Sequence, residues 1–293
     1  IGCALNVVLD PVAIFVLGWG MKGAALATIT GQIVSALLAV YYLFRPKSFR
    51  LKRVSFKPDA EILKHVLPLG ISSFLTQVSI VVIMAVMNNV LVIYGAGSKY
   101  GADIPMTVVG IVMKVFQIVI SVVVGIAAGA QPIVGYNYGA GLWRRVKLIF
   151  RTMMAAEFSV GLVSLICFEV FPVQIISVFG SEDGLYNEFA VLAFRVFLGG
   201  IVLCCIQKSC SIFLQSMGKP ALSMLLSLLR DFVLSVPLTL VLPRFFGVTG
   251  ALYSGPAADV ISFGAAVLCM AAVFRKLNRL EDGEVALSGA SQG

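Results

Sequence analysis

The sequence predicts an all-α membrane protein. Apolar residues make up 59% of its 293 residues and charged residues only 12%, compared with roughly 25% charged residues in soluble domains. A chain of this composition has too few polar side chains to cover its own surface, so part of that surface must face lipid. Because the apolar residues form continuous runs and do not alternate with polar ones, the runs are predicted to be helices and not strands.

Eight apolar runs are long enough for membrane helices. A helix needs roughly 20 apolar residues to cross a bilayer core of about 30 Å. The eight helices are predicted at residues 1–18, 24–44, 66–94, 105–136, 148–173, 189–216, 221–243 and 248–274.

The positions of the 22 Lys and Arg residues predict the orientation of these helices. Most of them lie in the connections at one side of the bilayer, including the stretch 45–65 and the residues after 274. The connections at the opposite side hold Lys22, Lys99 and Arg244. Since basic residues collect in cytoplasmic loops, residues 45–65 and the C-terminus are predicted to be cytoplasmic.

Two stretches of the chain resemble each other. DPVAIFVLGWGMKGAALAT lies near the start and SVPLTLVLPRFFGVTGALYSG lies near the end. The match pairs Pro11 with Pro237, Gly20 with Gly247 and Gly23 with Gly250, with one residue inserted in the later copy. Each copy predicts a helix, a glycine-centred turn and a second helix, and the copies are six predicted helices apart. This period predicts a duplicated bundle of two six-helix lobes with a cavity between them.

The period divides the chain into four parts. Residues 1–44 are predicted to be the last two helices of a first lobe, whose four earlier helices would precede Ile1. Residues 45–65 are predicted to be a cytoplasmic linker between the lobes, partly an amphipathic helix on the membrane surface. Residues 66–279 would form the complete second lobe, and residues 280–293 a disordered cytoplasmic tail.

The composition also argues against several classes of protein. The net charge of +8 comes from cations in short loops between apolar runs, which indicates a membrane protein and not a nucleic-acid partner. The six cysteines form no CxxC pair and the chain has one histidine, so zinc, disulfide and haem sites are not predicted. One histidine and the lack of a Ser/His/Asp set argue against a membrane-embedded enzyme.

Four motifs resemble the multidrug and toxic compound extrusion (MATE) family. They are Asn6-Val-Val-Leu-Asp10-Pro11, Gly18-Trp-Gly-Met-Lys-Gly-Ala-Ala25 with Ala27-Thr28, Gly129-Ala-Gln-Pro-Ile-Val-Gly-Tyr-Asn-Tyr-Gly139, and Phe213-Leu-Gln-Ser-Met-Gly-Lys-Pro220 followed by Leu229-Arg230. The resemblance extends in the same order to about Arg279. It implies a twelve-helix antiporter of the plasma membrane that exports organic, often cationic compounds in exchange for H⁺ or Na⁺, without a further cofactor.

The resemblance also implies a monomer that acts on small drug-like molecules by alternating access between two lobes. A flippase for lipid-linked oligosaccharide precursors is the alternative, because it could share this helix plan. It would be expected to carry more cations for a diphosphate head group, whereas Lys114, Lys208 and Arg230 are the ones available. The antiporter is therefore the predicted function.

Asn6 and Asp10 are the candidate cation site of the first lobe. They are four residues apart and share one helix face, and their oxygens, with a neighbouring Thr28, would suit a hard cation. Cations are not predicted beside Asp10 at its depth, which leaves it free to hold a proton or Na⁺. The resemblance implies that Asn6, Asp10 and Thr28 form the cation-coupling site. The alternative is an Asp that caps a helix or lines a cavity without a coupling role.

Two ion pairs are predicted from the depth of charged residues in the membrane. Glu157 and Lys208 lie at similar distances from the inner ends of their helices, and Glu169 and Arg195 match near the outer side. Because charges in a membrane are costly and tend to pair, both pairs are predicted to be structural.

The remaining polar and Met residues of the apolar runs are candidates for a substrate cavity. Lys114 and Asp259 lie near the midplane on different helices. Gln77, Gln117 and Gln207 fit either hydrogen bonds between helices or a cavity wall. Met84 and Met87 are three residues apart on one predicted face near Gln77, and Met adapts to varied apolar ligands, although such a pair also fits plain packing.

Overall fold

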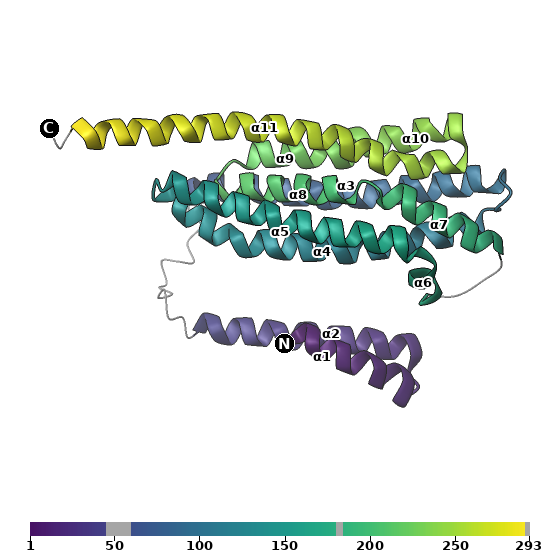
Figure 1. Cartoon of the computed structure of the whole chain (residues 1–293). Coiled ribbons are helices and arrows are strands. Elements are labelled where there is room, and N and C mark those ends of the chain that lie inside the picture. Colours follow the sequence, from purple (N-terminus) through teal and green to yellow (C-terminus); the bar gives the residue numbers. More distant parts are fainter. Residues whose placement is uncertain (45–59, 180–183, 291–293) are drawn as a thin grey trace. The chain divides into compact units, whose positions relative to one another are not determined.

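The computed structural model describes residues 1–44, 60–179 and 184–290 of the chain. Every regular element in these ranges is a helix, which confirms the predicted all-α class. The chain divides into two compact units, Ile1–Leu63 and Lys64–Gly293 (Figure 1). This division falls within the stretch 45–65 that the sequence predicts as the linker.

The first unit is a helical hairpin (Figure 1). α1 (Gly2–Pro11) continues into a π-helical turn at Val12–Val16, and α2 (Gly20–Phe44) packs against both. Pro11 has no backbone N–H to donate, and π-helical turns are a usual response to an interrupted helical ladder.

Glycine makes the turn and the close contact of this hairpin possible. Gly18 and Gly20 have φ angles of 65° and 54°, in the left-handed region that disfavours other residues. A Cβ at Gly23 would lie 2.9 Å from the carbonyl oxygen of Ala13. The two helices can therefore approach at this point only because Gly23 has no side chain.

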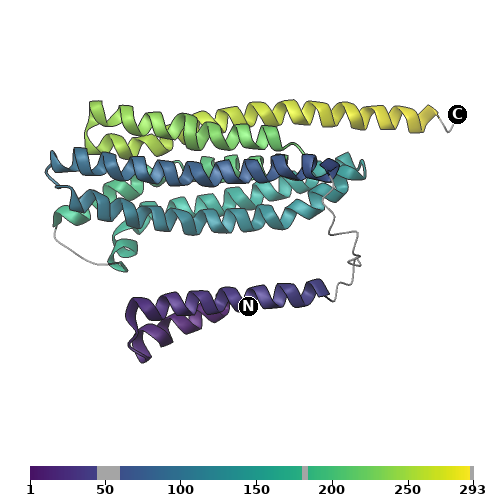
Figure 2. The same cartoon turned by 180° about the vertical axis from the view of Figure 1, so that it is seen from behind.

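The second unit is a bundle of long helices that run side by side (Figures 1 and 2). Its helices are α3 (Ala60–Ala96), α4 (Asp103–Gly139), α5 (Trp143–Val170), α6 (Pro172–Ser177), α7 (Gly184–Leu198), α8 (Ile201–Ser216), α9 (Pro220–Leu228), a π-helical segment (Leu229–Leu234), α10 (Ser235–Phe246) and α11 (Val248–Ala290). The first turn of α3 precedes the boundary between the two units. α8 packs against α4, α5, α9 and α11, so it is the central helix of the bundle.

Two apolar clusters hold the second unit together. One lies where α3, α4 and α7 meet and includes the fully buried side chains of Leu91, Phe189 and Phe194. The other joins α5, α8 and α11, where Phe150 packs at 4.8 Å from Phe213 and 4.9 Å from Phe274, measured between ring centroids. These packed rings fix the helices against one another at both ends of α8.

A glycine pair interrupts the helix predicted at 189–216. α7 ends at Leu198 and α8 begins at Ile201 with a bend of 40°, at Gly199 and Gly200. A Cβ at Gly200 would lie 2.7 Å from Oδ2 of Asp259. The break therefore lets α11 approach closely and brings an acidic side chain to the bundle interior.

The outer surface of the second unit is strongly apolar. Leu268 is 74% exposed, and Val163 and Leu225 are each 61% exposed. Six helices in the described ranges are long and apolar enough to cross a membrane, and the bent pair α7 and α8 makes a seventh if it counts as one span. Gly2–Val16 is a shorter apolar helix. The structure thus supports a multi-pass membrane protein, while the predicted number of eight spans stays a prediction.

The predicted linker and tail have different outcomes. Residues 45–59 of the linker lie outside the described residues, and Ala60 already belongs to α3. The predicted disordered tail is corrected, because α11 continues as a helix to Ala290, and residues 291–293 lie outside the described part. The start of this extension is anchored where Lys147 of α5 binds Asn278 at 2.8 Å and forms an ion pair with Glu281.

The last hairpin repeats the turn geometry of the first unit. Gly247, between α10 and α11, has a φ angle of 63°, as Gly20 has a positive φ between α1 and α2. A Cβ at Gly250 would lie 2.5 Å from the carbonyl oxygen of Leu242, as one at Gly23 would clash with Ala13. The matched glycines of the predicted repeat thus play the same two roles in both hairpins.

Candidate functional site

The structure brings the predicted cation-site residues of the first unit together. The amide nitrogen of Asn6 lies 3.5 Å from Oδ1 of Asp10 and 3.3 Å from Oγ1 of Thr28. With the amide turned over, the nitrogen donates to Asp10 Oδ2 at 3.1 Å and the oxygen accepts from Thr28 Oγ1 at 3.3 Å. We call Asn6, Asp10 and Thr28 the polar triad.

Local helix geometry explains how the polar triad forms. Asn6 and Asp10 are one turn apart on α1, so their side chains share a face. Thr28 reaches them from α2. In the first orientation of the amide, its hydroxyl accepts from Asn6 and donates its one proton to the carbonyl oxygen of Ala24 at 3.0 Å. The close contact at Gly23 keeps the two helices near enough for this interaction.

Asp10 lacks an ion-pair partner in the described part of the first unit. Lys22, the one Lys or Arg residue in the ranges 1–44 and 60–63, lies in the first turn of α2, and its ammonium group is not within ion-pair distance of Asp10. Asp10 and Asn6 are half-buried. The triad therefore offers oxygen atoms and one uncompensated carboxylate to a small cation.

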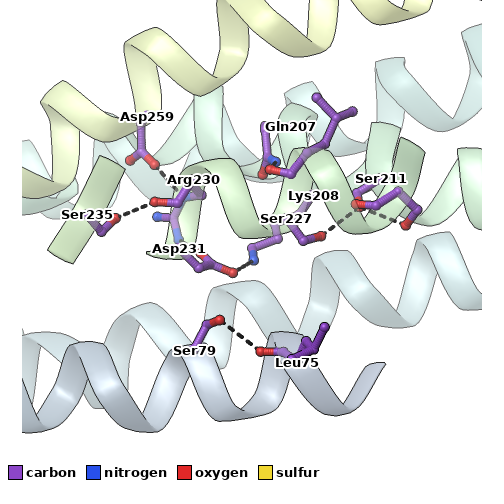
Figure 3. A network of polar contacts seen from close by, with 12 residues as sticks. Leu75, Ser79, Gln207, Lys208, Ser211, Ser227, Arg230, Asp231, Ser235 and Asp259 are labelled. Atoms are coloured by element: carbon purple, nitrogen blue, oxygen red, sulfur yellow. Dashed lines mark hydrogen bonds and ion pairs between the residues drawn. The ribbon is translucent and has the colours of Figure 1, made fainter. Parts of the chain in front are cut away.

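The second unit holds a different arrangement, a buried charge cluster of Lys208, Arg230, Asp231 and Asp259 (Figure 3). Lys208 Nζ lies 2.6 Å from Asp231 Oδ2, and Arg230 lies 2.7 Å from Asp231 Oδ1 and 2.8 Å from Asp259 Oδ1. Side-chain exposure is 14% for Lys208 and 4% for Asp231. Two cations and two acids alternate along this chain of contacts, so the cluster has no net charge.

The elements of the second unit position the buried charge cluster. Arg230 and Asp231 lie in the π-helical segment after α9, and the Ser235 hydroxyl donates to the Arg230 carbonyl oxygen at 2.7 Å. The Arg230 guanidinium lies 5.8 Å from the centre of the Phe116 ring on α4, a distance typical of cation–π contacts. The cluster thus ties together α4, α8, α11 and the π-helical segment.

The predicted ion pairs have opposite outcomes. Arg195 Nε lies 3.4 Å from Glu169 Oε2, as the sequence predicts. The pair of Glu157 with Lys208 is wrong, because Lys208 binds Asp231 instead. Depth along the membrane matched Glu157 with Lys208, but depth does not say which face of each helix points where. The usable signal in the sequence was Asp231, an acid directly after Arg230 that two cations could share.

The candidate cavity residues divide into an exposed and a buried group. Gln77, Met84, Lys114 and Gln117 are exposed on the surface of the second unit. Lys114 and Gln117, with Ser121, are spaced so that they share one face of α4. This exposed polar face of α4 is where the second unit could line a cavity.

Met87, Gln207 and Asp259 belong to the interior instead, which corrects their assignment to a cavity wall. Met87 is 2% exposed within the apolar core, so Met84 and Met87 do not share an exposed face. Gln207 is fully buried and donates to the Leu226 carbonyl oxygen at 3.0 Å. Asp259 is held by Arg230. Each of these residues points toward neighbouring helices and not outward.

A network of hydroxyl groups between α8 and α9 was not foreseen. Ser211 lies 3.0 Å from the Ser223 hydroxyl and 2.8 Å from the Ser227 hydroxyl, measured between oxygens, and part of this network is drawn in Figure 3. Small polar residues spaced four apart, such as Ser223 and Ser227, are the signal that could have indicated it, because such residues mark tight helix contacts in membranes.

Basic residues gather at one end of the second unit. A surface hollow of about 600 Å³ is lined by Arg144, Arg145, Lys147 and Arg151 with Glu281, and Arg275, Lys276 and Arg279 line another. Lys147 bridges the start of α5 to α11 through Asn278 and Glu281. The connection between α4 and α5 therefore lies at the same end of the bundle as the C-terminal part of α11.

Comparison with curated proteins identifies transport relatives. Multidrug export protein MepA of Staphylococcus aureus is 24% identical over 268 residues, which cover 90% of this chain and 56% of MepA. The MepA of Staphylococcus saprophyticus is 26% identical over 265 residues, with 90% and 56% covered. The chain thus spans a little over half the length of the curated relatives it matches.

Solved structures share the fold. An outward-facing conformation of a multidrug resistance MATE family transporter of the MOP superfamily superposes with a TM-score of 0.82 at 24% identity, covering 96% of this chain and 62% of that one. A MOP superfamily transporter from Pyrococcus furiosus gives a TM-score of 0.79 at 24% identity, covering 96% and 61%. The MatE family model matches residues 68–241. Since this match covers more than half of the chain and the fold agrees with it, the chain belongs to the MatE family of transporters.

Proposed function

We propose that the protein is a secondary antiporter that exports small organic, cationic or amphipathic, drug-like compounds in exchange for H⁺ or Na⁺. Two helical lobes alternate in exposing a central cleft, and the complete transporter acts as a monomer in the plasma membrane. The names of the MepA relatives, which are multidrug export proteins, support export of drug-like molecules.

The observation that carries this proposal is the polar triad without an ion-pair partner. A coupling ion drives a conformational change only through a difference in its affinity for the two states. The Asp10 carboxyl can make that difference, because the described part of the first unit places no basic side chain against it. Asn6 and Thr28 add neutral oxygen atoms that suit Na⁺, and the carboxylate alone suffices for a proton.

The exposed polar face of α4 supports a role of the second unit in substrate binding. Lys114 and Gln117 offer one cation and one amide on this face, and Met84, which is exposed on α3, adds one adaptable apolar side chain. This mixture suits amphipathic molecules. It does not favour the flippase alternative, because Lys208 and Arg230 are already neutralised by Asp231 and Asp259 and are not available for a diphosphate group.

The basic end of the second unit supports a cytoplasmic C-terminus. Seven Lys and Arg residues of two separate segments line the two hollows at this end, whereas Lys99 lies in the connection between α3 and α4. Basic residues are retained on the cytoplasmic side of membranes. We therefore orient the second unit with its basic end inside the cell.

Substitution of Asp10 tests the proposal. The protein from its complete reading frame, reconstituted in liposomes, should export a fluorescent cationic dye when a pH or Na⁺ gradient is imposed. In Asp10→Asn, we expect the stimulation of export by the gradient to fall by roughly 5- to 150-fold, the range of typical coupling free energies. Comparing the two gradients separately identifies the coupling ion.

Asp103→Asn is the matched control, because Asp103 is an exposed Asp in the first turn of α4. It should leave gradient-driven export unchanged. Export by Asp10→Asn at the wild-type rate and with the wild-type gradient dependence would refute the role of the triad.

A further inference from the structure

Glu157 stands apart from the other acidic residues of the second unit. It lies in the middle of α5, and its side chain is fully buried at 0% exposure. Neither of its carboxyl oxygens has a hydrogen-bond partner among the described residues. Ser209 of α8 faces the carboxyl, and its buried hydroxyl likewise lacks a hydrogen bond.

An isolated carboxylate is not expected at such a place. Moving an unpaired ionised carboxyl into a low-dielectric interior costs so much that the group takes up a proton instead. The other buried acids of this unit are paired: Asp231 binds Lys208 and Asp259 binds Arg230. Among the described residues, no Lys or Arg forms an ion pair with Glu157.

The helices packed against α5 supply no charge to Glu157. These helices are α4, α6, α7, α8 and α11, and the titratable group that interacts with Glu157 is the Cys205 thiol on α8. The charged groups on these helices are engaged or turned outward: Lys208 on α8 binds Asp231, Arg195 on α7 binds Glu169, Asp259 on α11 binds Arg230, and Lys114 on α4 is exposed.

The oxygen atoms near Glu157 fit a proton and not a metal ion. The carboxyl and the Ser209 hydroxyl offer three oxygens, whereas hard metal cations take about six or more. Gln207, whose buried Oε1 also has no partner, lies two residues before Ser209 and donates its amide to α9, so it faces away from α5. A protonated carboxyl, by contrast, needs one acceptor, and Ser209 can supply it.

We propose that Glu157 is a proton-binding site of the second unit, separate from the polar triad of the first. The carboxyl binds one proton while α5 and α8 are packed together, and releases it as H⁺ to water when this contact opens. The packing is tight one turn away, where a Cβ at Gly161 would lie 3.0 Å from the Val202 Cα, so water reaches Glu157 only if the helices move. The role of this proton in transport rests on the proposed antiport, but its binding does not.

Infrared spectroscopy of the purified chain in lipid nanodiscs tests the proton directly. At neutral pH, the wild-type chain should show the C=O stretching band of a protonated carboxyl, and Glu157→Gln should lose it. Glu169→Gln is the matched control, because Glu169 lies on the same helix but is 44% exposed and paired with Arg195. That variant should keep the band.

Thermal unfolding over a range of pH gives a second readout. Wild type should lose stability as the pH rises from below the ordinary pKa of glutamate to the pH at which folded Glu157 releases its proton, because the unfolded chain is ionised over this range while the folded chain still holds the proton. Glu157→Gln should not show this part of the pH dependence, since an amide resembles the protonated acid. If Glu157→Gln does not fold, Glu157→Leu provides the same comparison with an uncharged side chain.

The inference is overturned if the protonated band is absent from wild type, or if it persists in both uncharged Glu157 variants. It is also overturned if wild type and these variants respond identically to pH. Asp10→Asn should keep the band, so a failure of the proposed coupling at Asp10 and a failure of this proton site give different results.

Discussion

The first and last hairpins of the chain share a backbone design. In each, a glycine with positive φ makes the turn, and a second glycine three residues later lets the arms touch: Gly20 and Gly23 in the first, Gly247 and Gly250 in the last. Each also has a π-helical segment in its first arm, at Val12–Val16 and at Leu229–Leu234. The similarity of sequence therefore reports a similarity of backbone geometry.

The chemistry of the two hairpins is different. Matching Pro11 with Pro237 aligns Asn6 with Phe232 and Asp10 with Val236, so the polar triad has no counterpart in the last hairpin. There the acid Asp231 lies in the π-helical segment itself and is neutralised by Lys208 and Arg230. The comparison teaches that the two hairpins share their backbone geometry but differ in their side chains. The side chains determine whether an acid is paired with a cation of the protein or stays available to a mobile ion.

The largest effect should come from breaking the fixed charges. Arg230→Ala leaves Asp259 without a cation and Asp231 with only Lys208. Removing one partner of a buried ion pair costs about 3–5 kcal/mol, because a charge stays buried without compensation. We expect a loss of that size in the free energy of unfolding, measured by thermal or denaturant unfolding of the purified chain in detergent.

Asp10→Asn is the matched control for this prediction. Because Asp10 has no ion-pair partner in the described first unit, its charge can be removed without exposing another, and the stability of the chain should not fall. A loss of stability in Asp10→Asn comparable to that of Arg230→Ala would show that both hairpins hold fixed charges, and the contrast between them would fail.

The sequence predicted the positions of the helices better than the contacts between them. Apart from the end of α11, hydropathy placed the ends of the helices within about two turns, because burial in lipid demands long apolar runs. It did not predict the break at Gly199 and Gly200, since glycine is common in unbroken membrane helices too. It also missed that α11 continues to Ala290, where the polar composition of the tail suggested disorder.

The candidate sites show the same division. The polar triad was predictable because its members are one helical turn apart or joined by a short turn, so local geometry places them together. The partner of Lys208 was not predictable, because it depends on the rotation of α8 against the π-helical segment. Depth along the membrane is a one-dimensional measure, and it paired Lys208 with Glu157 on the wrong helix.

Substitution of the close-contact glycines should have a smaller effect and tests whether the two hairpins share their geometry. Gly250→Ala places a Cβ 2.5 Å from the Leu242 carbonyl oxygen, and Gly23→Ala places one 2.9 Å from that of Ala13. Overpacking of this kind costs about 1–3 kcal/mol. We expect both variants to unfold at lower temperature than wild type, with the larger decrease for Gly250→Ala.

Gly264→Ala is the control for the two glycine variants. Gly264 lies within α11 with open space where a Cβ would be, and Ala is favoured over Gly in a helix interior by about 0.5–1 kcal/mol. This variant should be as stable as wild type or more so. Equal tolerance of Ala at positions 23, 250 and 264 would contradict the shared close contact.

The smallest loss of stability should come from breaking an exposed ion pair. Comparing it with the buried charge cluster measures how much burial adds to the stabilisation by an ion pair. Lys99, in the connection between α3 and α4, donates to Glu188 at 2.7 Å, and both side chains are more than half exposed. The hydrogen bond to Glu188, followed by the contact with Tyr100, raises the pKa of Lys99 above its ordinary value. Stabilisation from this pair is therefore complete below the ordinary pKa of lysine, and it is lost as the pH rises through the raised value.

Lys99→Ala removes this pair without burying a charge. Because exposed pairs gain little and are screened by salt, we expect a much smaller decrease in unfolding temperature than for Arg230→Ala. The decrease should shrink further in high salt and at a pH where Lys99 is deprotonated. Unfolding curves of wild type and Lys99→Ala at low and high salt measure the difference. If Lys99→Ala lost as much stability as Arg230→Ala, and the loss did not depend on salt, burial would not explain why the buried ion pairs stabilise the chain more than the exposed one.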